Sequence, residues 1–246
     1  LFEVMGIKLF KKEGVEADDL IGSIVKQWHA EDLEFYIVSG DKDFMQLISN
    51  DVFLYSPKKG GVINIIDPDG VREKFGCGPE CVIDILAIMG DSADNVPGVK
   101  GIGEKGAAKL VGEYGNLESI YENIGKITAK RQKTSLENSK QMAFLSKELV
   151  TIKTDVALEI TKEDCKYKPS QHINETAVDE LFTDLGFNTI KQKIIDLKTQ
   201  VDAGSHQVHA AEPIDPSSIL DESSFEKSTV DYFLINSNPD FETLLG

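Results

Sequence analysis

The spacing of apolar residues predicts a helix over residues 15–30. Six of them fall on one helical face: Ala17, Leu20, Ile21, Ile24, Val25 and Trp28. The first turn carries Glu16, Asp18 and Asp19, and the helix dipole favours acidic side chains at that end. Three acids within four positions are more than the dipole needs, because neighbouring like charges repel. This turn is therefore a candidate cation site as well as an ordinary helix start.

A short apolar run, residues 33–39, has the composition of a buried parallel strand. It ends at Gly40-Asp41-Lys42-Asp43, and a helical pattern begins at Phe44. Helix, strand, acidic loop and helix form an α/β alternation. Ligands of open α/β sheets bind beyond the carboxyl ends of the strands, where Asp41 and Asp43 are expected. The alternative is an aspartate helix cap with a solvated neighbour.

Turn residues separate the elements that follow. Residues 52–56 and 61–66 flank Pro57-Lys58-Lys59-Gly60 and predict a hairpin. Asp67-Pro68 predicts a short helix that ends near Gly76. Residues 79–89 predict another helix, and Gly90 is its expected stop.

The stretch from Gly90 to Lys109 joins two acids to a glycine-rich turn. Asp91 and Asp94 come first, and Gly98, Gly101 and Gly103 precede a predicted helix from residue 104. Glycines let the backbone approach a ligand, and N–H groups at a helix start attract anions. This pattern indicates metal-dependent chemistry on a phosphate backbone. The alternative is a pair of acidic caps around a glycine-rich turn.

The remaining chain predicts short helices at 117–124, 141–149, 176–187 and 189–197, and a strand at 150–152. Basic residues gather in and before this part and form either one basic track or a solvated face: Lys100, Lys105, Lys109, Lys126, Lys130, Arg131, Lys133 and Lys140. Residues 198–227 have the composition of an acidic linker. Residues 229–235 predict a strand and residues 241–245 the start of a helix, so we expect a second domain to begin there.

The net charge of −16 argues at first against nucleic acid. Half of it, −8, follows residue 200, and seven acids of the preceding part are the candidate ligands. Without those seven, residues 1–200 carry −1, so a local basic surface remains compatible with DNA. No apolar run approaches the ~20 residues of a membrane span. Three cysteines, none at zinc-binding spacing with a histidine or another cysteine, suit a reducing cytosol.

The candidate ligands are seven carboxylates from three segments: Glu16, Asp18, Asp19, Asp41, Asp43, Asp91 and Asp94. Oxygen ligands favour hard ions such as Mg²⁺ or Mn²⁺, and a pair of such ions can hydrolyse a phosphodiester. The sequence contains neither a P-loop nor a recognisable Ser/His/Asp triad, which leaves little support for nucleotide hydrolysis or covalent catalysis.

Three motifs resemble the 5′-nuclease domain of bacterial DNA polymerase I, in the flap endonuclease superfamily. They are EADD at residues 16–19, GDKD at 40–43 and GDSADNVPGVKGIGEKGAAKL at 90–110, and LSKELVTIKTDV at 145–156 is also similar. The resemblance covers residues 1–197. It implies an α/β fold with a mostly parallel sheet flanked by helices, followed by a helical helix-hairpin-helix (helix-three-turn-helix) subdomain.

The resemblance also implies roles for individual residues. All seven carboxylates would hold two Mg²⁺ or Mn²⁺ ions, with Asp19, Asp41 and Asp43 at the catalytic position. Asp91 and Asp94 would serve the second, more weakly held ion. Duplex phosphates would contact the hairpin and its basic surroundings, with a K⁺ ion nearby. The implied DNA-binding residues are Gly98, Val99, Lys100, Gly101, Ile102, Gly103, Lys105, Lys109, Lys130 and Arg131.

The implied domains are part of the catalytic core at 1–89 and the hairpin subdomain with closing helices at 90–197. An acidic linker at 198–228 and the start of a proofreading-exonuclease-like domain at 229–246 follow. The family's first strand, with its aspartate, and its helical arch have no counterpart here. Leu1 also opens like the middle of a protein. We therefore expect an excerpt of a longer chain whose activity is severely reduced compared with the full-length parent.

The resemblance implies removal of RNA primers or 5′ flaps in replication and repair. The implied partners are double-stranded DNA with a 5′ flap or RNA-primed end and the polymerase domains of the parent chain, with no membrane. The implied location is the bacterial cytoplasm, at the nucleoid. Two alternatives remain: a non-catalytic duplex-DNA-binding module, and an interaction domain that uses the acidic tail.

Overall fold

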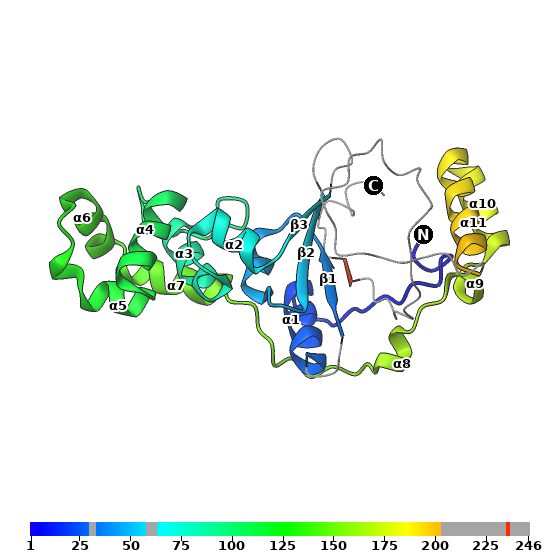
Figure 1. Ribbon diagram of the computed structural model, residues 1–246, viewed down its shortest axis with the longest axis horizontal. Coiled ribbons are helices and arrows are strands. Elements are labelled where there is room, and N and C mark those ends of the chain that lie inside the picture. The colour runs from blue at the N-terminus through cyan, green and yellow to red at the C-terminus, as the bar shows by residue number, and fades with distance from the viewer. Residues whose placement is uncertain (30–32, 58–62, 203–234, 237–246) are drawn as a thin grey trace. The chain divides into compact units, whose positions relative to one another are not determined.

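The computed structural model describes residues 1–29, 33–57, 63–202 and 235–236, and the chain divides into two compact units (Figure 1). The central unit contains Glu16–Ala157 together with Asn236–Gly246. The terminal unit contains Leu1–Val15 and Leu158–Ile235. This grouping differs from the predicted boundary at residue 89, which stays a prediction. The predicted acidic linker and most of the predicted second domain lie outside the described residues.

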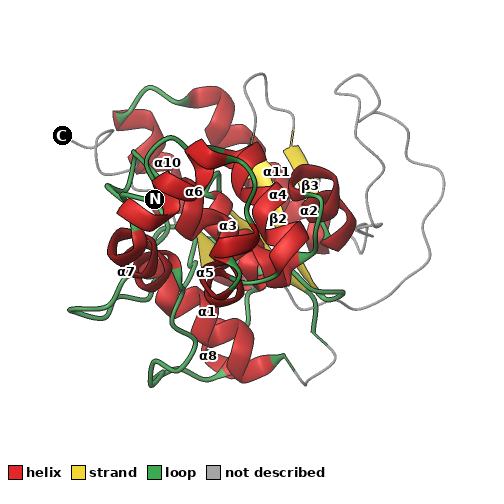
Figure 2. Cartoon of the chain, turned by 90° about the vertical axis from the view of Figure 1, so that its left-hand side faces the viewer, coloured by secondary structure: helices red, strands yellow, loops and turns green. Residues whose placement is uncertain are grey.

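A small mixed sheet forms one part of the central unit. Helix α1 (Ala17–Trp28) precedes strand β1 (Phe35–Val38), and the 3₁₀ helix η1 (Lys42–Leu47) follows it. Strand β2 (Val52–Pro57) pairs parallel with β1 and antiparallel with β3 (Ile63–Ile66). The two-residue strand β4 (Ile235–Asn236) crosses the sequence limit between the two units. Helix α2 packs on β3 and η1 on β2, so helices flank the sheet (Figure 2). The predicted hairpin and α/β alternation are confirmed.

Helices make up the rest of the central unit. They are α2 (Pro68–Phe75), η2 (Pro79–Cys81), α3 (Val82–Met89), α4 (Glu104–Tyr114), α5 (Leu117–Glu122), η3 (Ile124–Lys126), α6 (Lys130–Asn138) and α7 (Lys140–Val150). Asp67 Oδ1 accepts a hydrogen bond from Gly70 N at 2.7 Å and Gly76 ends α2 at φ 77°, as the sequence predicted. Helix α3 is buried over most of its length and packs against α4 and α7. None of the described helices is long and apolar enough to cross a membrane.

One sequence prediction for the central unit is refined and another is wrong. The helical pattern at Phe44 is confirmed, and it takes the tighter form of the 3₁₀ helix η1. The predicted strand at 150–152 is absent: Val150 ends α7, and the residues after it run without regular structure. Two side chains accept hydrogen bonds from the backbone of this stretch. Ile152 N donates to Gln46 Oε1 of η1 at 3.0 Å, and Lys153 N donates to Asp19 Oδ1 of α1 at 2.8 Å. Those donors are therefore not available to a neighbouring strand.

The terminal unit has a core of its own. Its helices are α8 (Lys162–Cys165), α9 (Pro169–His172), α10 (Glu175–Asp184) and α11 (Asn188–Asp202). Ile173, Val178, Phe182 and Ile194 form the buried cluster, and Val4 and Met5 of the N-terminal segment pack against it. Asn174 N also donates to Val4 O at 3.0 Å. The N-terminal residues thus complete this small helical unit.

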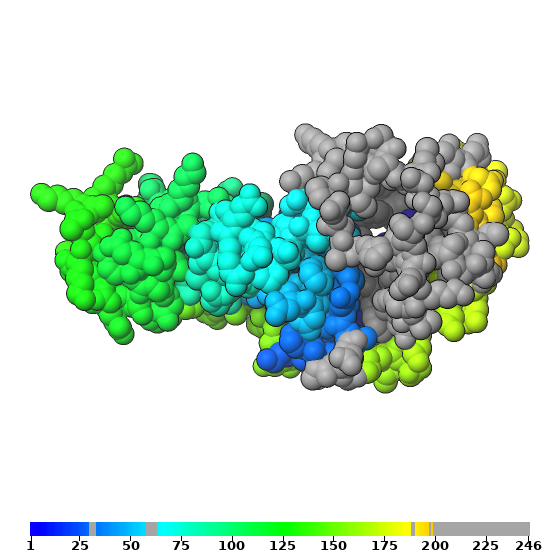
Figure 3. Space-filling view, viewed as in Figure 1, coloured from blue at the N-terminus to red at the C-terminus, as the bar shows by residue number. Residues whose placement is uncertain are grey.

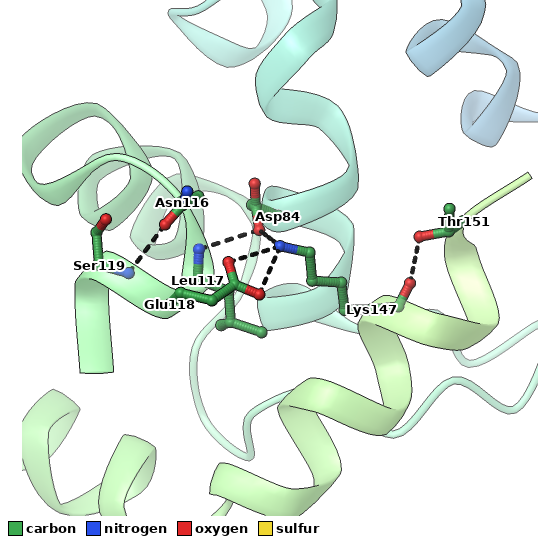
Figure 4. A network of polar contacts seen from close by, with 7 residues as sticks. All are labelled: Asp84, Asn116, Leu117, Glu118, Ser119, Lys147 and Thr151. Atoms are coloured by element: carbon green, nitrogen blue, oxygen red, sulfur yellow. Dashed lines mark hydrogen bonds and ion pairs between the residues drawn. The ribbon is translucent and has the colours of Figure 1, made fainter. Parts of the chain in front are cut away.

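A buried ion pair ties three helices of the central unit together (Figure 4). Asp84 of α3, nearly buried, lies 2.8 Å from Lys147 Nζ of α7 and accepts a hydrogen bond from Leu117 N at 3.0 Å. Lys147 Nζ also contacts Glu118 of α5 at 2.7 Å. These contacts fix α7 against α3 and the start of α5.

We expect Asp84→Ala to reduce the free energy of unfolding by about 2–3 kcal/mol, because it removes one partner of a buried pair while Glu118 still compensates Lys147. Urea unfolding followed by fluorescence of Trp28, the single tryptophan of the chain, reports on the central unit. The control Asp69→Ala breaks an exposed pair with Arg72 and should change stability by less than about 0.5 kcal/mol. Equal losses in both variants would contradict the structural role of Asp84.

Candidate metal centre and nucleic-acid interface

The aspartates after strand β1 stand at the start of η1. Asp41 precedes the first turn, and its Oδ1 accepts a hydrogen bond from Asp43 N at 2.9 Å. Asp41 N donates to Ser39 Oγ at 3.0 Å. Asp41 therefore caps a helix, as the simpler interpretation of this motif required. The cap also fixes the backbone from which the Asp43 side chain extends.

The carboxyl group of Asp43 is in an environment that suits a bound cation. Its Oδ1 is buried and has no hydrogen-bond partner among the described residues. The pKa of Asp43 is raised to about 7, mainly by burial and next by the negative charge of Asp41, while the positive charge of Lys42 lowers it. The charges of Asp91 and Asp94 contribute smaller parts of the same rise. A buried carboxylate oxygen without a donor is costly, and a metal ion would satisfy it.

The acids of α1 differ in their surroundings. Glu16 is the exposed residue before the first turn, and its side chain makes no capping hydrogen bond. Burial raises the pKa of Asp18, its own backbone N–H opposes the shift, and three carboxylates add to it: Glu16, Asp19 and Asp94. Asp19 is buried, and its Oδ1 accepts a hydrogen bond from Lys153 N at 2.8 Å. Asp19 is therefore held rigidly, whereas Asp18 faces other negative charge.

Asp91 and Asp94 lie in the loop that follows α3. Burial alone would raise the pKa of Asp91, but its ion pair with Lys42 and a hydrogen bond from Ala93 N lower it. Asp94 is exposed, yet partial burial and the charges of Asp91 and Asp41 raise its pKa. The loop thus extends the negative field of Asp41 and Asp43.

Electrostatic interactions therefore connect all three acidic segments. Asp43 interacts with Asp91 and Asp94, and Asp94 interacts with Asp18. Across residues 1–29, 33–57, 63–202 and 235–236, no three Asp, Glu, His or Cys side chains lie close enough to hold one metal ion. The assignment of all seven carboxylates as ligands accordingly stays a prediction. The unpartnered oxygen of Asp43 and the all-oxygen donor set do fit a hard divalent cation.

Lys42 is a residue of this site that the sequence did not single out. It lies between the two aspartates of the GDKD motif and forms an ion pair with Asp91, in the loop after α3. The sequence did show a lysine between two aspartates, but the role of Lys42 depends on Asp91, which is nearly fifty positions away in the sequence. Lys42 offsets part of the repulsion among the carboxylates.

The glycine-rich turn is joined directly to the acidic loop. Asp91 N donates to Val96 O at 3.0 Å, and Val96 N donates to Asp91 O at 2.7 Å. Gly98 adopts φ 60° and its Cα packs against the backbone of Gly90 so closely that a Cβ there would lie 2.5 Å from Gly90 N. A carboxylate candidate and the candidate phosphate-binding turn therefore share one small hydrogen-bonded loop.

The glycine-rich turn has fewer backbone N–H groups available to a phosphate than the sequence suggested. Three of its N–H groups already donate within the protein, at 2.9, 2.7 and 3.1 Å from their acceptors: those of Gly98, Val99 and Ile102. The side chains of Val99 and Ile102 are buried as well. The resemblance implies that main-chain N–H groups between Gly98 and Gly103 hold phosphate, and the remaining candidates are those of the exposed residues Lys100, Gly101 and Gly103.

Basic side chains surround this turn on α4 and α6. Helix α6 runs beside the turn and the start of α4. A Cβ on Gly101 of the turn would lie 3.9 Å from Ser135 Oγ of α6, and a Cβ on Gly106 of α4 would lie 3.5 Å from Gln132 Nε2 of α6. The surface of α4 to α6 is green in Figure 3. The predicted cations Lys100, in the turn, and Lys105, Lys109, Lys130 and Arg131, on α4 and α6, are all exposed. Several predicted DNA-binding cations thus lie in the turn and on the helices beside it.

Two family models match consecutive parts of the chain. Residues 1–76 match the 5′-3′ exonuclease N-terminal resolvase-like domain, and residues 77–173 match the 5′-3′ exonuclease C-terminal SAM fold. The chain belongs to the 5′-3′ exonuclease family. The α/β part followed by a helical part, predicted from the motifs, is confirmed by these two matches.

Bacterial DNA polymerases are among the relatives of this 5′-3′ exonuclease chain. DNA polymerase I of Bacillus subtilis is 38% identical over 195 residues, which cover 79% of this chain and 22% of the relative. DNA polymerase I of Pseudomonas aeruginosa is 38% identical over 230 residues, covering 90% of this chain and 24% of the relative. The chain therefore spans about a quarter of the length of these curated relatives or less.

Solved structures support the same fold. A T5 5′-exonuclease with bound zinc ions matches with a TM-score of 0.54 at 24% identity, over 77% of this chain and 62% of that one. A bacteriophage T5 flap endonuclease in a complex with DNA and metal ions matches with a TM-score of 0.54 at 23% identity, over 78% of this chain and 62% of that one. These likenesses show the fold of the exonuclease family.

Proposed function

We propose that this chain is the nuclease part of a DNA polymerase I. It would act as a divalent-metal-dependent 5′-3′ exonuclease and flap endonuclease that removes RNA primers or 5′ flaps in replication and repair. The observation that carries the proposal is the buried, unpartnered Oδ1 of Asp43 in the negative field of Asp41, Asp91 and Asp94. Asp91 also belongs to the loop that forms the candidate phosphate-binding turn.

The carboxylates would hold two Mg²⁺ or Mn²⁺ ions, since oxygen donors select hard cations. When bound, such a pair supplies an acidified water and stabilises the leaving oxygen in phosphodiester hydrolysis. Asp19, Asp41 and Asp43 would hold the ions beside the reacting phosphate. The other ligands would be Glu16, Asp18, Asp91 and Asp94. Lys42 would keep Asp91 in place and limit the repulsion within the set.

The turn and its neighbours would hold the duplex. The N–H groups of Lys100, Gly101 and Gly103, at the start of α4, are suited to phosphate oxygens, and such contacts position DNA without reading its sequence. The basic residues of α4 and α6 would add attraction to the backbone. A K⁺ ion at the turn belongs to the same proposal. The partners would be flap-bearing or RNA-primed duplexes and the polymerase domains of a longer chain, in the bacterial cytoplasm at the nucleoid.

Cleavage of a fluorescently labelled 5′-flap duplex by the chain tests this function. We expect cleavage products in the presence of Mg²⁺ and none in the presence of a chelator, because the carboxylates alone provide no electrophile. The rate is expected to be low compared with that of a full-length DNA polymerase I. Absence of both cleavage and DNA binding would contradict the proposal.

The second candidate is a non-catalytic duplex-DNA-binding module. The exposed basic residues of α4 and α6 favour it, because they do not depend on the acidic site. Under this function, DNA binding persists in the chelator and no acid-to-amide substitution alters any activity. Binding without cleavage in the flap assay would select this candidate.

A further inference from the structure

We propose that residues 146–156, here called the linking segment, hold the carboxylate site and the phosphate-binding turn in one fixed arrangement. Ser146 and Gln46 are the two positioning residues: Ser146 fixes the turn, and Gln46 fixes the backbone of Asp43. This inference rests on the proposed function. It adds residues that neither the acidic motifs nor the glycine-rich turn contain.

Ser146 is attached to the turn through a buried hydrogen bond. Its side chain is fully buried in α7, and its Oγ accepts from Gly98 N at 2.9 Å. The Cα of Gly98 also packs closely on the backbone of Gly90. The Lys147–Asp84 pair holds the next residue of α7 against α3. The Oγ of Ser146 therefore presents a fixed acceptor to the turn.

Gln46 joins the other end of the linking segment to the acidic loop. Its Nε2 donates to Asp43 O at 2.9 Å and to Val150 O at 2.8 Å. Its Oε1 accepts from Ile152 N at 3.0 Å. One amide group thus bridges the backbone of a candidate metal ligand and the residues that follow α7. Displacement of the linking segment would shift Asp43.

The linking segment also holds the acidic turn of α1. Lys153 N donates to Asp19 Oδ1 at 2.8 Å, and Val156 N donates to Ser23 Oγ at 3.0 Å. A Cβ on Gly22 would lie 2.6 Å from Ile152 Cγ2, so the segment lies directly on α1. The linking segment, eleven consecutive residues, is therefore hydrogen-bonded to the acidic turn of α1, to Gln46 of η1 and to the glycine-rich turn.

This arrangement has a consequence for a bound duplex. A phosphate held by the turn would lie at a set distance from the carboxylates, because Ser146 and Gln46 connect both to the same short segment. Loss of Ser146 Oγ should loosen the turn and leave Asp43 in place, because Asp43 is bonded to the segment through Gln46. Loss of the Gln46 amide should loosen Asp43 and leave the turn in place.

Two binding constants of the whole chain test this separation. One is the Kd for a fluorescein-labelled 5′-flap duplex in chelator, measured by anisotropy; the other is the Kd for Mn²⁺ without DNA, measured by electron paramagnetic resonance. We expect Ser146→Ala to raise the DNA Kd roughly five- to tenfold, the effect of one lost buried hydrogen bond, with the Mn²⁺ Kd unchanged. Gln46→Ala should raise the Mn²⁺ Kd by a similar factor with the DNA Kd unchanged.

Matched variants separate positioning from general damage. Gln141→Ala removes an exposed amide from the same helix α7 and should change neither constant. Gln46→Met keeps the bulk of the side chain without its hydrogen bonds and should reproduce the Gln46→Ala result. If Gln46→Met behaves like the unsubstituted chain, or if Ser146→Ala and Gln46→Ala change the same constant, the inference is wrong. An unsubstituted chain that binds neither DNA nor Mn²⁺ would instead overturn the proposed function itself.

Discussion

Asp43→Asn is expected to reduce Mg²⁺-dependent cleavage of a 5′-flap duplex by roughly 10³-fold or more, the scale of losing a group that stabilises charge at a reacting centre. Asparagine keeps the size of the side chain but removes the negative charge at the buried oxygen that has no partner. The Kd for the same duplex in chelator should change less than about twofold, because the proposed phosphate contacts are on the turn and its basic neighbours.

The same substitution should stabilise the protein in metal-free buffer. Asp43 has a pKa of about 7 in the folded protein against an ordinary value of 3.8, so its contribution to stability is greatest below 3.8 and is lost as the pH rises through 7. At pH 8 the unfolding free energy of Asp43→Asn should exceed that of the unsubstituted chain by about 1–3 kcal/mol. Added Mn²⁺ should stabilise only the unsubstituted chain.

Asp69→Asn is the matched control, because Asp69 is exposed in α2 and paired only with Arg72 among the contacts described for it. It should retain cleavage, DNA affinity and stability. Cleavage by Asp43→Asn at the unsubstituted rate would show that this carboxylate does not serve the reaction. A loss of DNA affinity equal to the loss of cleavage would indicate a damaged fold instead.

Local signals in the sequence predicted most elements of the central unit. The apolar face from Ala17 to Trp28 gave α1, and Asp67-Pro68 with Gly76 gave the limits of α2. These predictions succeeded because periodicity and capping act between residues a few positions apart. At Phe44 the apolar spacing was compatible with a helix but did not distinguish the tighter 3₁₀ form.

Contacts between distant residues could not be predicted in the same way. Gln46 meets Val150 and Ile152, which are 104 and 106 positions away, and Ser146 meets Gly98 across 48 positions. No periodic pattern encodes such pairs, and the β-branched residues around Ile152 suggested a strand instead. The acidic motifs themselves were visible, since each places two or three carboxylates within four consecutive positions. Lys42 escaped notice because its role depends on Asp91.

Gly98→Ala should lower the free energy of unfolding of the central unit by about 3 kcal/mol or more, since it combines a left-handed backbone with overpacking. Gly98 has φ 60°, and an added Cβ would lie 2.5 Å from Gly90 N and 2.7 Å from Gly90 Cα. These are backbone atoms, and the residue after Gly90, Asp91, is paired with Val96, so the clash cannot be relieved by turning a side chain. Urea unfolding followed by Trp28 fluorescence measures the loss.

Gly103→Ala provides the comparison, because it changes the same turn without crowding it. A Cβ on Gly103 meets nothing within 4 Å and its φ is −92°, so only the poorer helix cap of alanine should count, about 1 kcal/mol or less. The added methyl group would, however, stand where a phosphate is proposed to approach the start of α4, and the DNA Kd should rise. The two glycines thus separate the folding of the turn from its function. Unchanged DNA affinity in Gly103→Ala would mean that phosphate does not approach the backbone there, whatever Gly98→Ala does to stability.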